Sequence, residues 1–284
     1  MKNLFKTVLV TAVFAASGVQ AAEQAWQATG FAQPESALYS ADLGYIYVSN
    51  IEGHPLEADG KGFISRVKPT GEVESLRWAE GLDAPKGLAI FEGFLYVADL
   101  TQVVKIDLMT GEVVHRYKAS EAKMLNDIAV SEAGELFVTD FVGQAIYRFG
   151  PETELTLWQS GADLHHPNGL LWHEGELWVA AWGKEMQPDF TTKAPGHIYR
   201  FNTETGKRTA YEGKNVRGNL DGLTLSNDQL YVSDWIKGEV YRVTPQGLEL
   251  EVKQPSGTAD IGSAKGLILV PEMWEGRVTA WASQ

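Results

Sequence analysis

The chain has 284 residues, of which 44% are hydrophobic, so it is long and apolar enough to fill a core. It contains 37 acidic and 24 basic residues and no cysteine, which gives a formal net charge of −13. The missing cysteine excludes disulfides, thiolate metal sites and thiol nucleophiles. The negative charge repels phosphate groups and therefore argues against a nucleic acid partner.

The first 21 residues have the three parts of a secretory signal peptide. Lys2 and Lys6 supply the charged start, Val8–Ala16 the apolar stretch, and Val19-Gln20-Ala21 the small residues of a cleavage site. The apolar stretch is too short to cross a bilayer. We therefore expect a signal peptide over 1–21 and one exported domain over 22–284, periplasmic or secreted and without a membrane span.

Six short apolar runs recur along the rest of the chain, and five of them end in a polar or acidic residue. They are Tyr47-Val48-Ser49-Asn50, Tyr96-Val97-Ala98-Asp99, Phe137-Val138-Thr139-Asp140, Trp178-Val179-Ala180-Ala181, Tyr231-Val232-Ser233-Asp234 and Leu269-Val270-Pro271-Glu272. Their spacing of roughly 40 to 50 residues is typical of propeller blades or solenoid units.

Each repeat contains several stretches of period 2 separated by turn residues, which predicts antiparallel strands. In chain order, a lone strand at Trp26–Phe31 precedes the repeats. The repeats follow at Glu35–Trp78, Pro85–Tyr117, Met124–Gln159, Pro167–Tyr211, Leu220–Val252 and Thr258–Gln284. The last repeat has only three strands. We predict an all-β, six-bladed β-propeller of four-stranded antiparallel blades, its last blade closed by the N-terminal strand, with Gly183–Pro195 as a loop over the mouth.

The residue that opens the first strand of a blade lies on the same face as the residue that closes the second. This predicts that Glu35, Asn126, Asn168 and Asp221 meet at one mouth. The strand-closing residues Asn50, Asp99, Asp140, Asp234 and Glu272 are expected there too. A hard cation would offset the repulsion among these carboxylates, and Ca²⁺ prefers carboxylate and amide oxygens. We expect Glu35, Asn126, Asn168 and Asp221 to bind it.

Simpler interpretations compete with part of this set. Asn168-Gly169 and Asp221-Gly222 are also common turn dipeptides, and Asp99, Asp140 and Asp234 are better interpreted as caps of loop amides. Ile51, Leu100, Phe141, Trp182, Trp235 and Met273 follow the second strands, and either line the mouth or pack between blades. His165 and His166 are interpreted as exposed loop residues.

Four motifs resemble those of a known family. They are Pro34-Glu35-Ser36, Leu125-Asn126-Asp127, Pro167-Asn168-Gly169-Leu170 and Leu220-Asp221-Gly222-Leu223. They are similar to the motifs of the gluconolactonase and regucalcin (senescence marker protein) family. That family belongs to a calcium-dependent six-bladed propeller superfamily with the paraoxonases and diisopropyl fluorophosphatase. The resemblance implies a divalent ion, usually Ca²⁺, held by Glu35, Asn126, Asn168 and Asp221, and hydrolysis of a lactone or other ester.

The chain departs from the sugar-lactone members of that family at one informative position. Those members carry an arginine two residues before the third-blade asparagine, and Met124 stands there instead. An apolar substrate pocket is therefore expected, lined by Met124, Phe141, Trp182 and Trp235. Asp221 is the expected general base, and a direct nucleophilic role is the alternative that sequence does not separate from it. The alternative function is a non-catalytic ligand- or protein-binding propeller with a structural calcium ion.

Overall fold

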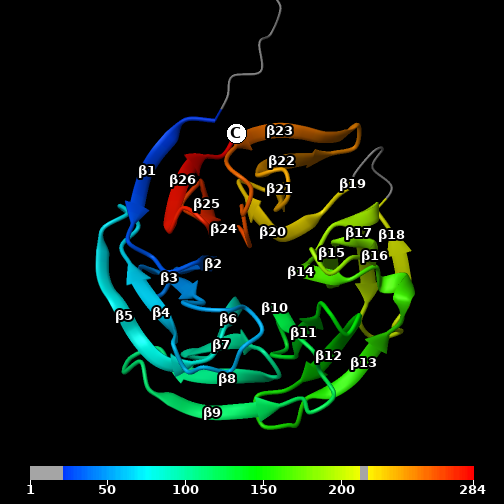
Figure 1. Cartoon of the computed structure of the whole chain (residues 1–284), viewed down its shortest axis with the longest axis horizontal. Coiled ribbons are helices and arrows are strands. Elements are labelled where there is room, and N and C mark those ends of the chain that lie inside the picture. Colours follow the sequence, from blue (N-terminus) through cyan, green and yellow to red (C-terminus); the bar gives the residue numbers. More distant parts are fainter. Residues whose placement is uncertain (1–21, 212–216) are drawn as a thin grey trace, which may run out of the picture.

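The computed structural model describes residues 22–211 and 217–284, and the predicted signal peptide lies outside them. Six antiparallel sheets stand around a common centre, as Figure 1 shows, so the predicted six-bladed propeller is confirmed. The described residues contain no α-helix, and their one helical turn is the 3-10 turn Ala162–Leu164. No helix in this part of the chain is long and apolar enough to cross a membrane.

The first three blades each contain four strands paired in chain order. Blade 1 has β2 (Pro34–Ser40), β3 (Tyr45–Asn50), β4 (Gly62–Val67) and β5 (Val73–Leu82). Blade 2 has β6 (Pro85–Phe91), β7 (Phe94–Asp99), β8 (Gln102–Asp107) and β9 (Val113–Lys118). Blade 3 has β10 (Leu125–Val130), β11 (Leu136–Asp140), β12 (Ala145–Phe149) and β13 (Thr156–Ser160). In each blade the first strand is the innermost.

Blade 4 is larger than the others. It has β14 (Pro167–His173), β15 (Glu176–Ala181), β17 (Thr192–Asn202) and β18 (Arg208–Ala210), and it adds β16 (Gly183–Met186) and β19 (Arg217–Gly218), which both pair with β17. Blade 5 has β20 (Leu220–Ser226), β21 (Gln229–Asp234), β22 (Glu239–Thr244) and β23 (Gly247–Lys253). Blade 6 has β24 (Gly262–Ala264), β25 (Leu267–Glu272), β26 (Arg277–Ala282) and β1 (Gln24–Thr29).

The N-terminal strand closes the ring as the sequence predicts. β1 pairs antiparallel with β26, and Ala28 lies opposite Val278 in the register. The two strands lie side by side in Figure 1 although they come from opposite ends of the chain. This pairing covers the edges that β1 and β26 would otherwise expose.

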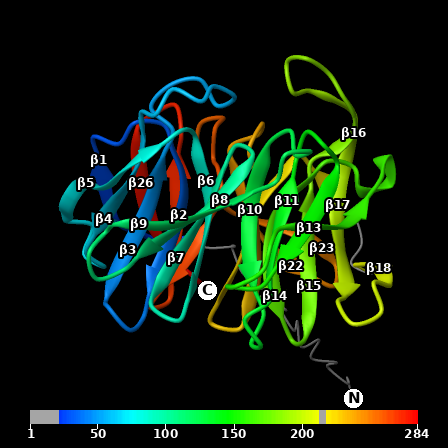
Figure 2. The ribbon, with the colours of Figure 1, turned by 90° about the horizontal axis from the view of Figure 1, so that it is seen from below.

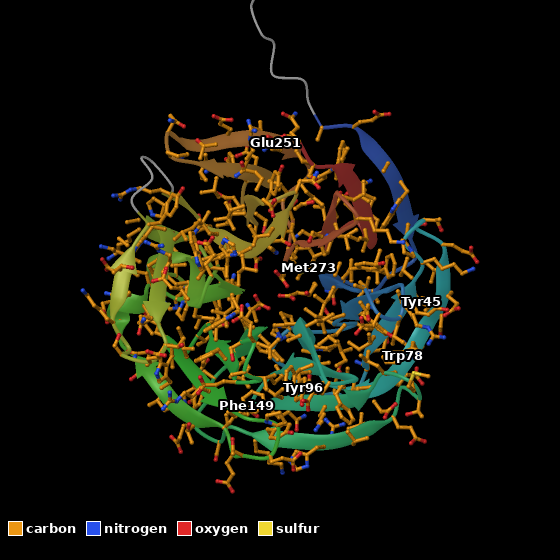
Figure 3. All side chains as sticks on the ribbon, turned by 180° about the vertical axis from the view of Figure 1, so that it is seen from behind. Tyr45, Trp78, Tyr96, Phe149, Glu251 and Met273 are labelled. Atoms are coloured by element: carbon orange, nitrogen blue, oxygen red, sulfur yellow. The ribbon has the colours of Figure 1, made fainter. Side chains whose placement is uncertain are left out.

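The core lies between the faces of neighbouring blades, and it explains the repeated apolar runs. The valine of each run is completely buried, at Val48, Val97, Val138, Val179, Val232 and Val270. Aromatic rings fill the wider outer part of the wedge between two blades. Tyr96 of blade 2 and Phe149 of blade 3, labelled in Figure 3, have ring centroids 6.2 Å apart. Burial of apolar surface between blades therefore sets the period of the sequence.

Candidate functional site

The innermost strand of each of the first five blades carries a bulge near its start. In blade 4, Pro167 pairs with Ala181 and Leu170 with Val179. Two residues, Asn168 and Gly169, therefore lie opposite a single residue of β15. The same register shift occurs at the corresponding positions of blades 1, 2, 3 and 5. A bulge bends its strand and redirects the side chains within it, so one position per blade is turned away from the regular pleat.

The first bulge residue of each of these five blades lines one cavity of about 130 Å³. These residues are Glu35, Lys86, Asn126, Asn168 and Asp221. All five side chains are buried. The structure thus brings the four sequence-predicted ligands to one place and adds a lysine from blade 2.

Three buried oxygen atoms at this cavity lack a hydrogen-bond partner. They are Glu35 Oε2, Asn126 Oδ1 and Asn168 Oδ1. Buried polar atoms are rarely left unpaired, because losing their contact with water costs free energy. Carboxylate and amide oxygens are the ligands that Ca²⁺ prefers, so this donor set fits a hard cation. No group of three or more His, Asp or Glu in the described residues is placed to hold a metal, so such a site would depend on the two asparagines.

The two carboxylates of the cavity are electrostatically unfavourable, and the charge of Lys86, which lowers the pKa of Glu35, offsets this only in part. Burial raises the pKa of Glu35 well above its usual range, and the charge of Asp221 raises it further. Burial and the nearby charge of Asp260 likewise raise the pKa of Asp221, which a hydrogen bond from the Asn168 side chain partly opposes. A bound divalent cation would favour the ionised forms of both groups.

Two more buried carboxylates line a central channel of about 390 Å³. Asp127 follows Asn126 in β10, and Asp260 precedes β24 and forms an isolated bridge with Ser36. Asp127 Oδ2 accepts a hydrogen bond of 2.6 Å from the Leu170 amide and so joins blades 3 and 4. Asp260 Oδ2 accepts one of 2.5 Å from the Ser36 hydroxyl and joins blades 6 and 1. Burial raises the pKa of Asp260 to about 7. These acids fasten the inner strands together below the cavity.

Apolar side chains form the rest of the cavity wall. The predicted pocket residues Met124, Phe141, Trp182 and Trp235 all line it. Phe141 and Trp182 meet edge to face with centroids 5.5 Å apart. Met273 also lines the cavity, and Figure 3 shows it near the middle of the ring. Ile51 lines the cavity too, whereas Leu100 does not and packs behind Ile51 and Met273.

The predicted loop Gly183–Pro195 is a β-hairpin, because β16 pairs with the first half of β17. This hairpin and the loop after β3 stand out on one side of the ring in Figure 2, and both contribute to the cavity. Trp182 Nε1 donates a 2.8 Å hydrogen bond to the carbonyl of Phe190 at the hairpin tip. The Phe190 ring stacks near Phe141, with centroids 6.2 Å apart. The hairpin therefore adds an aromatic wall.

The sequence model of the SMP-30/gluconolactonase/LRE-like region matches residues 33–260, which include every inner strand from β2 to β20. The chain belongs to this family. No curated protein shows a significant match. Among solved structures, a streptogramin B lyase superposes with a TM-score of 0.63 at 14% identity, covering 93% of this chain and 97% of the lyase.

Two further structures share the fold of this family member. A catalytically inactive virginiamycin B lyase from Staphylococcus aureus with quinupristin gives a TM-score of 0.59 at 15% identity, covering 91% of this chain and 99% of its own. A chain of a nidogen/laminin complex gives a TM-score of 0.62 at 17% identity, covering 78% of this chain and 86% of its own. Because the fold occurs in a lyase and in a complex of two proteins, the function of this family member must be argued from its site.

The acidic residues that close the second strands have the structural role expected of them. Asp99 accepts hydrogen bonds from the amides of Asp83 and Ala84, at 3.0 and 2.7 Å. Asp140 accepts from Met124 and Gly143, and Asp234 from Asn219 and Lys237. Their role as caps of loop amides is confirmed, and they shape the loops around the cavity.

Sequence reasoning missed Lys86, Phe190 and the burial of one histidine. Lys86 could have been found from the sequence. Pro85-Lys86-Gly87-Leu88 has the pattern of Pro167-Asn168-Gly169-Leu170, with lysine in place of asparagine. His166 was expected to be exposed but is buried, and its Nδ1 lies 2.9 Å from the carbonyl oxygen of Phe141. Its role is to hold the backbone behind the aromatic wall.

Proposed function

We propose that this protein is an exported hydrolase of lactones or related esters that uses a divalent cation, with Ca²⁺ favoured. The observation that carries the proposal is the set of unpartnered buried oxygens of Glu35, Asn126 and Asn168 beside the Asp221 carboxylate. Membership of the SMP-30/gluconolactonase/LRE-like family supports it. The apolar wall supports an apolar acyl or lactone substituent over a sugar acid.

Glu35, Asn126, Asn168 and Asp221 would hold the cation. When bound, a divalent cation supplies Lewis-acid stabilisation of the negative charge that develops on an ester carbonyl oxygen. Asp221 would accept a proton from water at its carboxylate. Phe141 and Trp182 would hold the apolar part of the substrate and limit access of bulk water.

The proposal is tested by calorimetric titration of the purified mature protein with CaCl₂, followed by turnover of a panel of lactones and aryl esters. We expect calcium binding, and turnover that a chelator abolishes. Asp221→Asn should lower turnover at least about 100-fold at saturating calcium, because it removes the base. Asp228→Asn is the matched control, since Asp228 lies in an exposed turn of the same blade and has a φ of 59°, which asparagine adopts easily.

Each other outcome has a definite meaning. Wild-type turnover by Asp221→Asn under saturating calcium would remove this residue from the chemistry. Calcium binding without turnover of any lactone or ester would favour the non-catalytic binding propeller. Absence of calcium binding in the wild-type protein would contradict the proposed metal site itself.

A further inference from the structure

Lys86 occupies the position in blade 2 that Glu35, Asn126, Asn168 and Asp221 occupy in their own blades. It follows Pro85 at the start of β6, and the register of β6 shifts there as in the other inner strands. The side chain lines the cavity although the residue is only 2% exposed. A charged lysine at this point cannot bind a metal cation. Burial lowers the pKa of Lys86, and the charges of Glu35 and Asp99 oppose that shift and favour the ammonium form.

The ammonium group of Lys86 has unused hydrogen-bonding capacity. Nζ donates to the carbonyl oxygen of Ala84 at 2.8 Å and to that of Pro55 at 3.1 Å. An ammonium group has three N–H donors, and these two carbonyls are the acceptors found for it in the described residues. None of the ion pairs among those residues involves Lys86. The backbone thus fixes the position of the charge and leaves one donor for a ligand.

The surroundings of Lys86 select for an amphiphilic partner. Lys86 is the one basic side chain among the described residues that line the cavity. The opposite wall is formed by large apolar side chains, with Trp182 and Trp235 in contact at a centroid distance of 6.0 Å. A buried positive charge strongly favours an anionic partner when water is excluded. A molecule that fits both features has an apolar chain and one anionic group.

We propose that Lys86 is a substrate-binding residue that holds the carboxylate of an apolar organic acid, the acid released when its ester or lactone is hydrolysed. The identity of this acid rests on the proposed function. The same N–H would donate to the carbonyl oxygen of the uncleaved ester, with the stronger, charge-assisted hydrogen bond formed to the anion. The substrates are then lactones and esters of apolar acids.

The test measures binding and needs no turnover. Hexanoate and its neutral counterpart hexanamide are titrated calorimetrically into the calcium-loaded wild-type protein, Lys86→Met and Lys86→Gln. Wild-type protein should bind hexanoate at least about tenfold more tightly than hexanamide. Both variants should lose at least about tenfold in affinity for hexanoate and little for hexanamide, because only the anion forms a charge-assisted hydrogen bond with Lys86.

Two controls separate a local effect from a general one. Lys123→Met removes one positive charge from an exposed position that does not line the cavity, and it should leave hexanoate binding unchanged. Titration of each variant with CaCl₂ alone and a melting curve show that metal binding and folding are retained. Lys86→Gln keeps a hydrogen-bond donor without the charge, and it provides the comparison if the methionine variant does not fold.

The outcomes distinguish this proposal from the proposed function. Wild-type hexanoate affinity in a folded, calcium-loaded Lys86 variant would overturn the role of Lys86, even if the wild-type protein hydrolyses esters. An equal loss in Lys123→Met would overturn it as well. If the Lys86 variants lose hexanoate binding but the wild-type protein turns over no ester, Lys86 is an anion-binding residue and the proposed hydrolase function is contradicted.

Discussion

Gly169 shows why the residue after a candidate ligand is as restricted as the ligand itself. A Cβ atom at this position would lie 2.0 Å from the backbone oxygen of Asp221 in the next blade. Gly169 lies within β14 and its φ is not in the left-handed region, so Asn168-Gly169 is not a turn dipeptide here. The glycine allows blades 4 and 5 to approach closely, and this approach brings Asn168 beside Asp221.

Replacing Gly169 with alanine should therefore lower both stability and calcium affinity. The added methyl group forces two inner strands apart, and overpacking of this kind costs about 1–3 kcal/mol. Urea denaturation in calcium-free buffer measures the stability, and calorimetric titration with CaCl₂ measures the affinity. Gly150→Ala is the matched control, because its Cβ would meet nothing closer than 3.4 Å. An unchanged free energy of unfolding in Gly169→Ala would contradict the close packing of the two strands.

At the scale of single elements, the β16–β17 hairpin determines the shape of the apolar wall. Its tip carries Phe190, whose ring lies near Phe141 and whose carbonyl accepts the Trp182 indole N–H. None of the candidate cation ligands comes from this hairpin. The hairpin can therefore influence the choice of substrate without changing the metal site.

Phe190→Ala should raise KM for an ester of an apolar acid about tenfold and leave calcium affinity unchanged. The variant loses part of the apolar surface that contacts the substrate. Full burial of a large apolar side chain contributes about 1.5–3 kcal/mol, and a partial loss of this free energy corresponds to about tenfold in KM. Steady-state kinetics with a short and a medium-chain ester measure the effect, which should be larger for the longer chain. Met109→Ala, at a residue that is 76% exposed and remote from the cavity, serves as the control. Equal KM values for Phe190→Ala and the wild-type protein would show that the hairpin takes no part in substrate binding.

The elements also show where sequence reasoning succeeds and where it fails. Blade boundaries could be predicted because the buried valines and their turns repeat with a fixed period, and closure by β1 followed from the missing strand in blade 6. The bulges could not be predicted, since the extra residue is visible only in the pairing of two strands. The hairpin was missed because its strands extend beyond the sheet of their blade, where the period of the repeat gives no information.

At the scale of the whole molecule, ring closure gathers acidic side chains from separate blades around one axis. Glu35, Asp127, Asp221 and Asp260 come from blades 1, 3, 5 and 6, and burial raises the pKa of each. Apolar packing between blades outweighs the cost of placing these carboxylates together. The buried carboxylates therefore lower the stability of the propeller, and the size of this effect depends on pH and on bound cations.

The calcium-free protein should lose stability as pH rises from about 4 to 8. Asp260 has a pKa of about 7 in the folded protein and about 3.9 when unfolded. The folded form thus binds the proton more tightly. The stability that this group contributes is fully present below the unfolded pKa and is lost as pH rises through the folded pKa. Saturating CaCl₂ should raise Tm most at pH 8, where the carboxylates are ionised.

Asp260→Asn should reduce this decline. The amide oxygen can still accept the Ser36 hydroxyl, so the main change is the loss of a titrating group, worth on the order of a few kcal/mol at pH 8. Melting curves at pH 5, 6, 7 and 8 in chelator-treated buffer measure the effect, with Asp42→Asn on the surface as the control for loss of charge. The variant should melt close to the wild-type protein at pH 5 and above it at pH 8. Parallel declines in the two proteins would mean that Asp260 titrates alike in the folded and unfolded states, so that its carboxylate adds nothing to the electrostatic cost of closing the ring.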